Sequence, residues 1–101
     1  MRRGTTPIHT FTLPVDASQI EKVRINYAQA RNLVLVKTEQ GAVEFQNNIL
    51  KVRLSQEETL LFSSNMDVEI QMDILEKTGD TLRSEVLRVD VDRCLNEEEL
   101  V

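Results

Sequence analysis

The sequence predicts an all-β fold: an antiparallel, immunoglobulin-like β-sandwich of about seven strands with one short helix. The first observation is residues 67–74, where Val68, Ile70, Met72 and Ile74 alternate strictly with polar side chains. A period of two predicts a strand with one buried and one solvated face. Similar runs recur about every ten residues between turn signals, as in small sandwiches and barrels. The apolar residues are mostly Val, Ile and Leu, with 4% aromatic residues, which also favours strands.

The first half of the chain predicts three strands. Residues 8–13 form the first one, at a sheet edge, because the flanking prolines 7 and 14 cannot donate to a β-ladder. Residues 16–19 allow one helical turn, and the alternation over residues 23–27 predicts the next strand. After a turn at residues 29–32, residues 33–36 are apolar on both faces. Such a run is either a central strand whose outer face is covered or a surface used for association.

The middle of the chain predicts a hairpin followed by the helix. Strands over residues 42–45 and 49–54 are joined by two asparagines, which tolerate positive φ. Ser55 then fits an N-cap with Glu58 at the third helical position, which is the capping-box pattern. We expect one or two helical turns that close the open end of the sandwich with Leu61 or Phe62.

The end of the chain predicts one last strand with a defect. Residues 78–80 form a hairpin turn whose glycine suits the left-handed region. In residues 82–91 the apolar pattern changes phase, and a bulge near Val86 would reconcile the two halves. The 101 residues form one domain, residues 1–101, with flexible ends at residues 1–6 and 96–101.

Composition excludes several classes of function. A net charge of −5 opposes binding to nucleic acid, and the basic residues are scattered. No apolar run has the length of a signal peptide or a membrane span, so we expect a protein made in the cytoplasm, without a signal peptide or membrane contact. Cys94 is the single cysteine, which excludes an internal disulfide, and we expect it to be a small buried apolar residue.

Candidate chemistry is sparse. His9 is the single histidine and has no identifiable nucleophile or orienting carboxylate near it in sequence. Asp90 and Asp92 share one strand face and could bind a cation together with Asp73, but acidic residues at alternate positions are equally typical of a solvated strand face. Adjacent glutamates at residues 57–58 and 97–99 have no apolar pocket to raise a pKa. We therefore expect a protein that is not an enzyme and has no metal site and no cofactor.

Three stretches carry a resemblance to a known group of proteins. They are residues 2–14 (RRGTTPIHTFTLP), 54–62 (LSQEETLLF) and 92–95 (DRCL). With them the chain resembles small structural proteins encoded in the tail or baseplate clusters of prophages from Gram-positive gut bacteria. It is also similar, through residues 4–7 and the strand pattern, to the N-terminal domain of phage baseplate upper proteins. The resemblance implies an accessory or adaptor role, virion association, and either self-association or contact with other phage structural proteins.

These readings lead to a hypothesis about function. A sandwich with exposed edges can add strands to a neighbour's sheet, here through residues 8–13 or 33–36. The residues expected to carry a protein contact are Phe11, Leu33 and Leu35. The alternative is a small module that binds carbohydrate or another ligand, although sugar platforms usually need exposed aromatic rings. A third possibility is an enzyme on an unfamiliar scaffold that uses His9 or Cys94.

Overall fold

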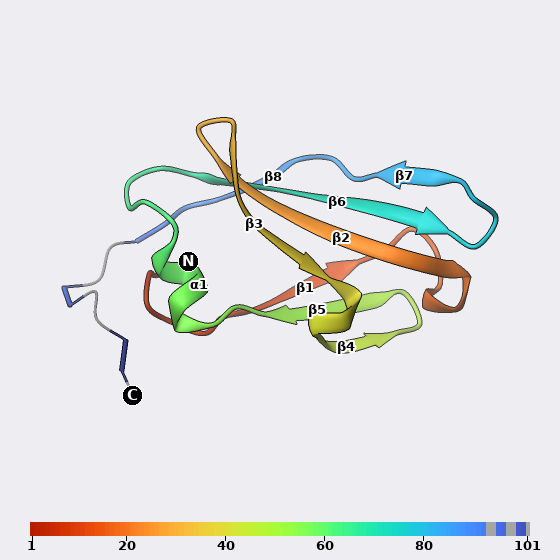
Figure 1. Cartoon of the computed structure of the whole chain (residues 1–101), viewed down its shortest axis with the longest axis horizontal. Helices are drawn as coiled ribbons and strands as arrows, with labels where there is room; N and C mark the ends of the chain where they lie inside the picture. Colours follow the sequence, from red (N-terminus) through yellow and green to blue (C-terminus); the bar gives the residue numbers. More distant parts are fainter. Residues whose placement is uncertain (93–94, 97–98, 101) are drawn as a thin grey trace.

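A computed structural model describes residues 1–92, 95–96 and 99–100, and these form two antiparallel sheets (Figure 1). The three-stranded sheet has the order β1 (Ile8–Thr12), β5 (Ile49–Arg53), β4 (Ala42–Gln46). The larger sheet has the order β3 (Asn32–Thr38), β2 (Ile20–Gln29), β6 (Val68–Glu76), followed by β7 (Thr81–Arg83) and β8 (Leu87–Val89), which both pair with β6. The remaining elements are the helix α1 (Gln56–Leu60) and the single 3₁₀ turns η1 (Ala17–Gln19) and η2 (Glu39–Gly41). The predicted all-β sandwich is confirmed, and β1 lies at a sheet edge as expected.

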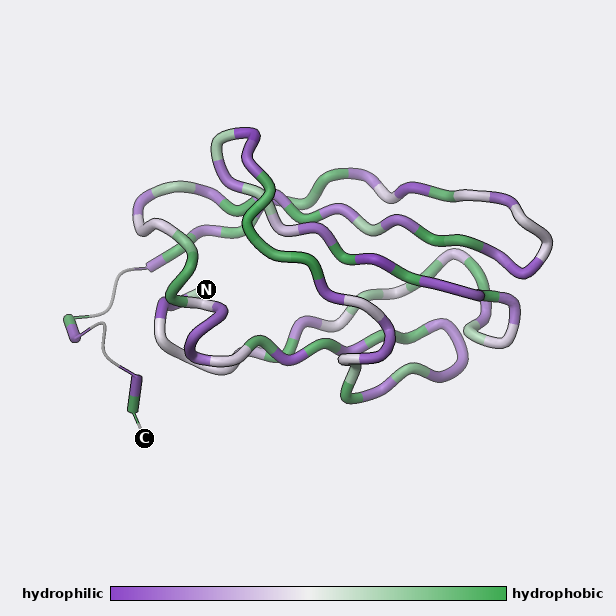
Figure 2. The backbone as a smooth tube through the Cα atoms, viewed as in Figure 1, coloured by the Kyte–Doolittle hydropathy of each residue, from purple (hydrophilic) through white to green (hydrophobic). Residues whose placement is uncertain are grey.

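One apolar core fills the space between the two sheets. On β6 the four alternating apolar residues are all buried, and the polar residues between them face outward, which confirms the reading of residues 67–74. A similar alternation of hydropathy runs along β2 (Figure 2). Its buried side chains include Ile25 and Tyr27. Phe11 and Leu13 contribute from the first edge, and Leu50 and Val52 from β5. Residues of both sheets therefore belong to one core cluster.

The strand order differs from the immunoglobulin one. An immunoglobulin constant domain places its second strand in the sheet with the first, fifth and fourth. Here β2 lies instead between β3 and β6, and pairs with both. The sandwich architecture is therefore immunoglobulin-like, but the assignment of strands to the two sheets is not. Alternation along a strand predicts which of its side chains are buried. It does not predict which strands are its neighbours in the sheet.

The predicted bulge near Val86 is present. Arg83 pairs with Asp73 and Leu87 pairs with Ile70, so three residues, 84–86, face two residues on β6. The ladder continues through Ser84, whose N–H donates to Met72 O (2.9 Å) and whose Oγ accepts from Met72 N–H (2.8 Å). The extra residue divides the expected last strand into β7 and β8, which is why eight strands are observed where about seven were expected.

The helix α1 begins as the sequence predicts. Ser55 Oγ accepts the Glu58 N–H (3.1 Å), and Glu58 Oε1 accepts the Ser55 N–H (2.8 Å), which completes the capping box. The chain leaving the helix buries Phe62 completely, where it packs against Tyr27 with ring centroids 5.9 Å apart. Leu61 remains 54% exposed. Of the two residues expected to enter the core, Phe62 is therefore the one that does so.

Residues 1–6, expected to be a flexible end, are instead attached to the body of the protein. Arg3 Nη2 donates to Leu60 O (2.8 Å), and the Gly4 N–H donates to Thr59 Oγ1 (3.0 Å). The Arg3 N–H donates to Asp92 O (2.9 Å). These groups meet partners more than fifty residues away, and local sequence carries no signal for such contacts. Cys94, Glu97 and Glu98 lie outside the described residues, as does part of the expected flexible end at 96–101.

Candidate functional site

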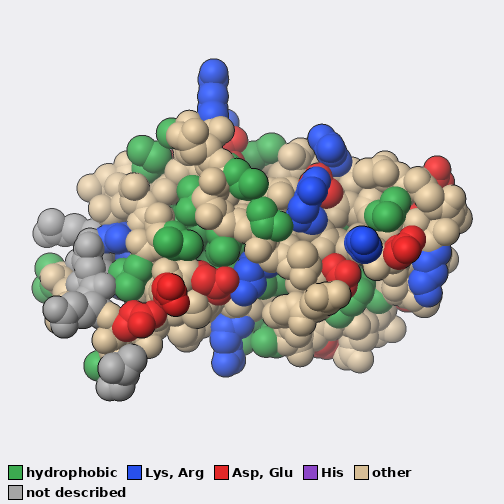
Figure 3. Space-filling model, in the orientation of Figure 1, with side chains coloured by type: hydrophobic (Ala, Val, Ile, Leu, Met, Phe, Trp, Pro, Cys, Tyr) green, Lys and Arg blue, Asp and Glu red, His purple; other side chains and the backbone are tan. Residues whose placement is uncertain are grey.

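The outer face of the larger sheet carries an uncovered apolar surface beside its edge strand β3. In antiparallel pairing, residues directly opposite each other share a face. Val36 pairs with Asn26 and Leu33 with Ala28, so all four side chains lie on the outer face of the sheet. Leu33 is 62% exposed and Val36 is 39% exposed. The space-filling view shows hydrophobic side chains gathered along β3 (Figure 3).

This arrangement decides between the two readings of residues 33–36. The run is not a covered central strand, because β3 is an edge strand and its outer face is open. The inner face of the run is apolar because it contributes to the core, where Leu35 pairs with the buried Tyr27. Val34 is the extra residue of a β-bulge and lies opposite the pair Tyr27 and Ala28. Both Val34 and Leu35 are partly buried against the core.

The three residues expected to carry a protein contact are in three different environments. Leu33 is exposed on the outer face, Leu35 is half-buried, and Phe11 is buried with 5% exposure. The placement of Phe11 at a contact surface is therefore wrong. It pairs with Leu50 across β5, so its side chain points into the core, and the edge position of β1 exposes its backbone and not this ring.

A shallow depression of about 250 Å³ continues this surface across the sheet. Its apolar lining comes from Ala28, Leu33 and Val86, and Val86 is 46% exposed. The rest of the lining is polar: the amide side chains of Asn26 and Gln71, and the charged Arg31 and Glu69. The phase change near Val86 predicts the bulge, but no local pattern indicates that Val86 and Leu33 line the same depression. We call Leu33, Val36 and Val86, with Ala28 beneath them, the β3 face.

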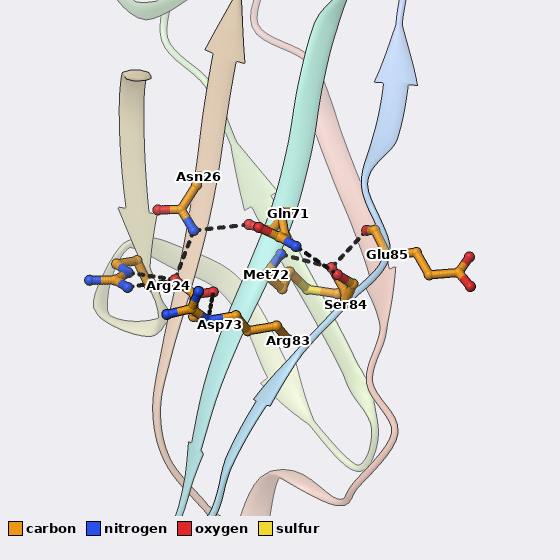
Figure 4. Close-up of polar contacts among 8 residues, drawn as sticks. All are labelled: Arg24, Asn26, Gln71, Met72, Asp73, Arg83, Ser84 and Glu85. Atoms are coloured by element: carbon orange, nitrogen blue, oxygen red, sulfur yellow. Dashed lines mark hydrogen bonds and ion pairs between the residues drawn. The ribbon is translucent and has the colours of Figure 1, made fainter. Parts of the chain in front are cut away.

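Next to the β3 face, Asp73 is held in a polar network on the same side of the sheet (Figure 4). Its Oδ2 accepts hydrogen bonds from Arg24 Nε (2.9 Å) and Nη2 (2.6 Å) and from Asn26 Nδ2 (3.0 Å). Its Oδ1 lies 3.4 Å from Arg83 Nε. Partial burial favours the neutral acid, but the hydrogen bonds and the two guanidinium charges outweigh it and lower the pKa of Asp73. These contacts clamp three strands together and occupy the carboxylate that was considered as a cation ligand.

His9 has a structural partner in the interior. Its Nδ1 lies 2.9 Å from Tyr27 Oη, and its ring meets Phe11 edge-on with centroids 6.4 Å apart. Burial, with a smaller effect from the charge of the chain's N-terminus, lowers the pKa of His9. Burial and the nearby charge of Glu58 raise the pKa of Tyr27. The histidine and the phenol therefore stay neutral at pH 7 and satisfy each other, and within the described residues no carboxylate bonds to His9.

The described part of the chain contains no group of three side chains suited to hold a metal ion. Within the same residues, no helix is long and apolar enough to cross a membrane. Aromatic platforms for sugar are also lacking, because Phe11, Tyr27 and Phe62 are buried and Phe45 is partly buried against the core. Among the described residues, other apolar side chains such as Val43, Leu61 and Leu87 are also exposed, but the β3 face combines Leu33 and Val86 in one depression.

No protein-family model, no curated protein and no solved structure matches this chain.

Proposed function

We propose that this domain is a non-enzymatic structural or adaptor protein of a phage or prophage assembly that acts by binding another structural protein through the β3 face. The observation that carries the proposal is the exposure of Leu33, Val36 and Val86 together on one uncovered sheet face. Apolar side chains that gather on the surface of a small domain mark contact sites more often than isolated ones do. The resemblance to tail and baseplate components supplies the class of partner, and the protein would be made in the cytoplasm and carried on the virion.

The mode of contact we propose is packing on the sheet face and not strand addition to β3. Two features protect the β3 edge against pairing: the bulge at Val34, and the inward-facing Lys37. The Lys37 Nζ lies 2.9 Å from Glu58 Oε2, so an added strand would have to fit beside this ion pair. A partner that packs flat on the outer face meets neither obstacle. Leu33 would be the anchor because it is the most exposed side chain of the β3 face.

The amides of Asn26 and Gln71 bound the polar side of this surface. Asn26 Nδ2 already donates to Gln71 O (3.2 Å) and to Asp73, and Gln71 Nε2 donates to Ser84 O (3.0 Å). Their positions are thus fixed before a partner arrives, which lowers the entropy lost on binding. The carbohydrate alternative has no comparable support, because the aromatic rings that would stack on a sugar are inside the domain.

The test is co-purification with structural proteins encoded beside this chain, each co-expressed with it in turn. We expect one of them to co-elute with the wild-type domain. In that complex, Leu33→Asp should weaken binding by about 10- to 100-fold, the equivalent of about 1.5–3 kcal/mol for one buried leucine. The matched control is Leu61→Asp, which changes a leucine of similar exposure at the end of α1 and should leave the affinity unchanged.

A thermal melt of each variant separates loss of contact from loss of fold. Leu33 is exposed, so Leu33→Asp should melt within a few degrees of the wild type. The proposal is overturned if none of the co-encoded structural proteins binds, or if Leu33→Asp and Leu61→Asp bind the partner with equal affinity.

A further inference from the structure

The first strand, β1, has a sheet edge with the features of a pairing surface. The described residues form four sheet edges, at β1, β3, β4 and the β7/β8 side. The β3 edge has its bulge and the inward Lys37, the β4 ladder has a register shift between Ala42 and Glu44, and the β7/β8 edge is interrupted at residues 84–86. Bulges, interruptions and inward charges are the usual protections against edge-to-edge pairing.

The β1 edge lacks all of these protections. Its register with β5 is regular over all five residues, and the strand contains no charged residue, glycine or proline. Its outward side chains, Ile8, Thr10 and Thr12, are exposed. Beside the end of the strand a groove of about 420 Å³, floored by Leu13, Met72 and other apolar residues, opens between the sheets. In Figure 1, β1 lies on the side of β5 away from β4.

The hydrogen bonds at the two ends of the ladder fix which backbone groups are unpaired. The Leu54 N–H donates to Pro7 O (3.0 Å), and the Leu13 N–H donates to Asn48 O (2.7 Å). Residues 7 and 13 therefore belong to hydrogen-bonded pairs with β5. Such pairs alternate along an antiparallel ladder, so residues 9 and 11 also bond to β5.

The even-numbered residues consequently face the free side. Ile8, Thr10 and Thr12 point their N–H and C=O groups away from β5, which leaves a row of three donors and three acceptors along this edge. Pro14 continues the same alternation and has no N–H to offer. The free row is therefore three residues long and ends at Thr12.

We infer that two copies of this chain pair through their β1 edges, antiparallel and with the two-fold axis at Thr10. In this register Thr10 faces Thr10 of the second copy, and Ile8 faces Thr12 at both ends. Each of these positions becomes a hydrogen-bonded pair, so six N–H···O=C bonds form and every free group of the row is used. Pro14 lies beyond each end of the seam, and the pairing ends there because proline has no N–H to donate. The result is a continuous six-stranded sheet across two sandwiches.

Side-chain chemistry favours a second copy as the occupant. Each chain has a net charge of −5, so two copies repel each other overall, and a seam without charged side chains adds no close-range repulsion to this. The paired residues would be Thr with Thr, Ile with Thr and His9 with Phe11, and cross-strand threonine and aromatic pairs are favourable ones. Two cations lie one strand away from the seam in β5: Arg53 is opposite Ile8, and Lys51 is opposite Thr10 and already 3.0 Å from Glu44 Oε2. No like charges are brought face to face.

This inference uses residues that the proposed function does not, so either can fail alone. Light scattering on the full chain should give twice the monomer mass of 11.6 kDa at high concentration, and the monomer on dilution. Thr10→Lys should raise the dimer dissociation constant at least tenfold, because the two-fold axis places the new charge opposite itself. Thr81→Lys, a matched change on the exposed strand β7, should leave dimerisation unchanged.

The register has its own test. Thr10→Glu alone should also be monomeric, but an equimolar mixture with Thr10→Lys should recover the dimer, because opposite charges then meet at the axis. In a Cys94→Ser background, Thr10→Cys should form a disulfide-linked dimer under mild oxidation, because hydrogen-bonded antiparallel partners have Cα atoms about 5.5 Å apart. Thr81→Cys is the control and should not cross-link.

The inference is overturned if the wild type stays monomeric at millimolar concentration. It is also overturned if Thr10→Lys dimerises as well as Thr81→Lys, or if the two cysteine variants cross-link equally. A thermal melt of Thr10→Lys is the control for folding: a cooperative transition near that of the wild type shows that the variant is a folded monomer. Binding of the structural partner through Leu33 should persist in Thr10→Lys, which separates this result from a failure of the proposed function.

Discussion

Replacing Thr59 with valine should release the N-terminal segment from the helix α1 and destabilise the whole domain. Thr59 is fully buried, and its Oγ1 accepts the Gly4 N–H (3.0 Å), while its single proton is shared between Thr5 O (2.9 Å) and Gln56 O (3.1 Å). Valine has nearly the same shape but offers neither a donor nor an acceptor. The substitution therefore keeps the packing and removes the partners of two backbone groups.

The magnitude follows from the surroundings of those groups. An unpaired buried donor or acceptor costs about 1–3 kcal/mol. Gly4 is half-buried and Thr5 is exposed, so water can reach the carbonyl in part, and the lower end of the range applies to each. We expect Thr59→Val to lower the free energy of unfolding by about 2 kcal/mol, which for a domain of this size lowers Tm by roughly 8–16 °C.

Thr59→Ser is the matched control because it keeps the hydroxyl and loses one methyl group, a change of about 1 kcal/mol. Chemical denaturation of both variants measures the difference, and hydrogen exchange reports where it arises. The Gly4 amide should exchange faster in Thr59→Val and remain protected in Thr59→Ser. If the valine variant is as stable as the serine variant and Gly4 stays protected, the hydroxyl does not hold this segment and the reasoning fails.

Two further predictions concern pH. Because the folded pKa of Asp73 is lowered, its contacts add stability above the unfolded pKa of about 3.9, and this stability is lost as the pH falls through the folded pKa. In an acid titration, the free energy of unfolding of Asp73→Asn should therefore fall less steeply with decreasing pH than that of the wild type. Identical curves for the two proteins would exclude this role of Asp73. The folded pKa of His9 is also lowered, so the unfolded chain takes up a proton first and stability should fall as the pH drops below about 6.5. Melts between pH 7 and 5 should lose this dependence in His9→Gln, and an unchanged dependence would assign it to another group.

Several local features were predictable because their causes are local. The alternation over residues 67–74 sets which side chains of β6 are buried, whatever strand lies next to it. The capping box at Ser55 joins residues three apart, and the phase change near Val86 is itself the pattern that one extra residue produces. Gly79 adopts a positive φ of 95° in the turn where the sequence places it. In each case the interacting groups lie within a few positions of each other.

The candidate contact surface could be predicted in part. Residues 33–36 stood out because they are apolar on both faces, and Leu33 is indeed exposed. Phe11 was misplaced because an edge strand still buries one of its two faces. Val36 belongs to the same apolar run, and the bulge at Val34 places it on the face of Leu33. Val86 was missed because its proximity to Leu33 depends on the order of β3, β2 and β6 and on the bulge opposite β6.

The sequence by itself determined the strands, most of the turns, the helix start and the buried faces of β2 and β6. The tertiary structure alone decided that β2 lies between β3 and β6, that the outer face of β3 is open, and that residues 1–6 are fastened to α1. The reason is physical. A period of two reports that the two faces of a strand differ in environment, whereas neighbours, free edges and long-range hydrogen bonds depend on segments that meet only when the chain has folded.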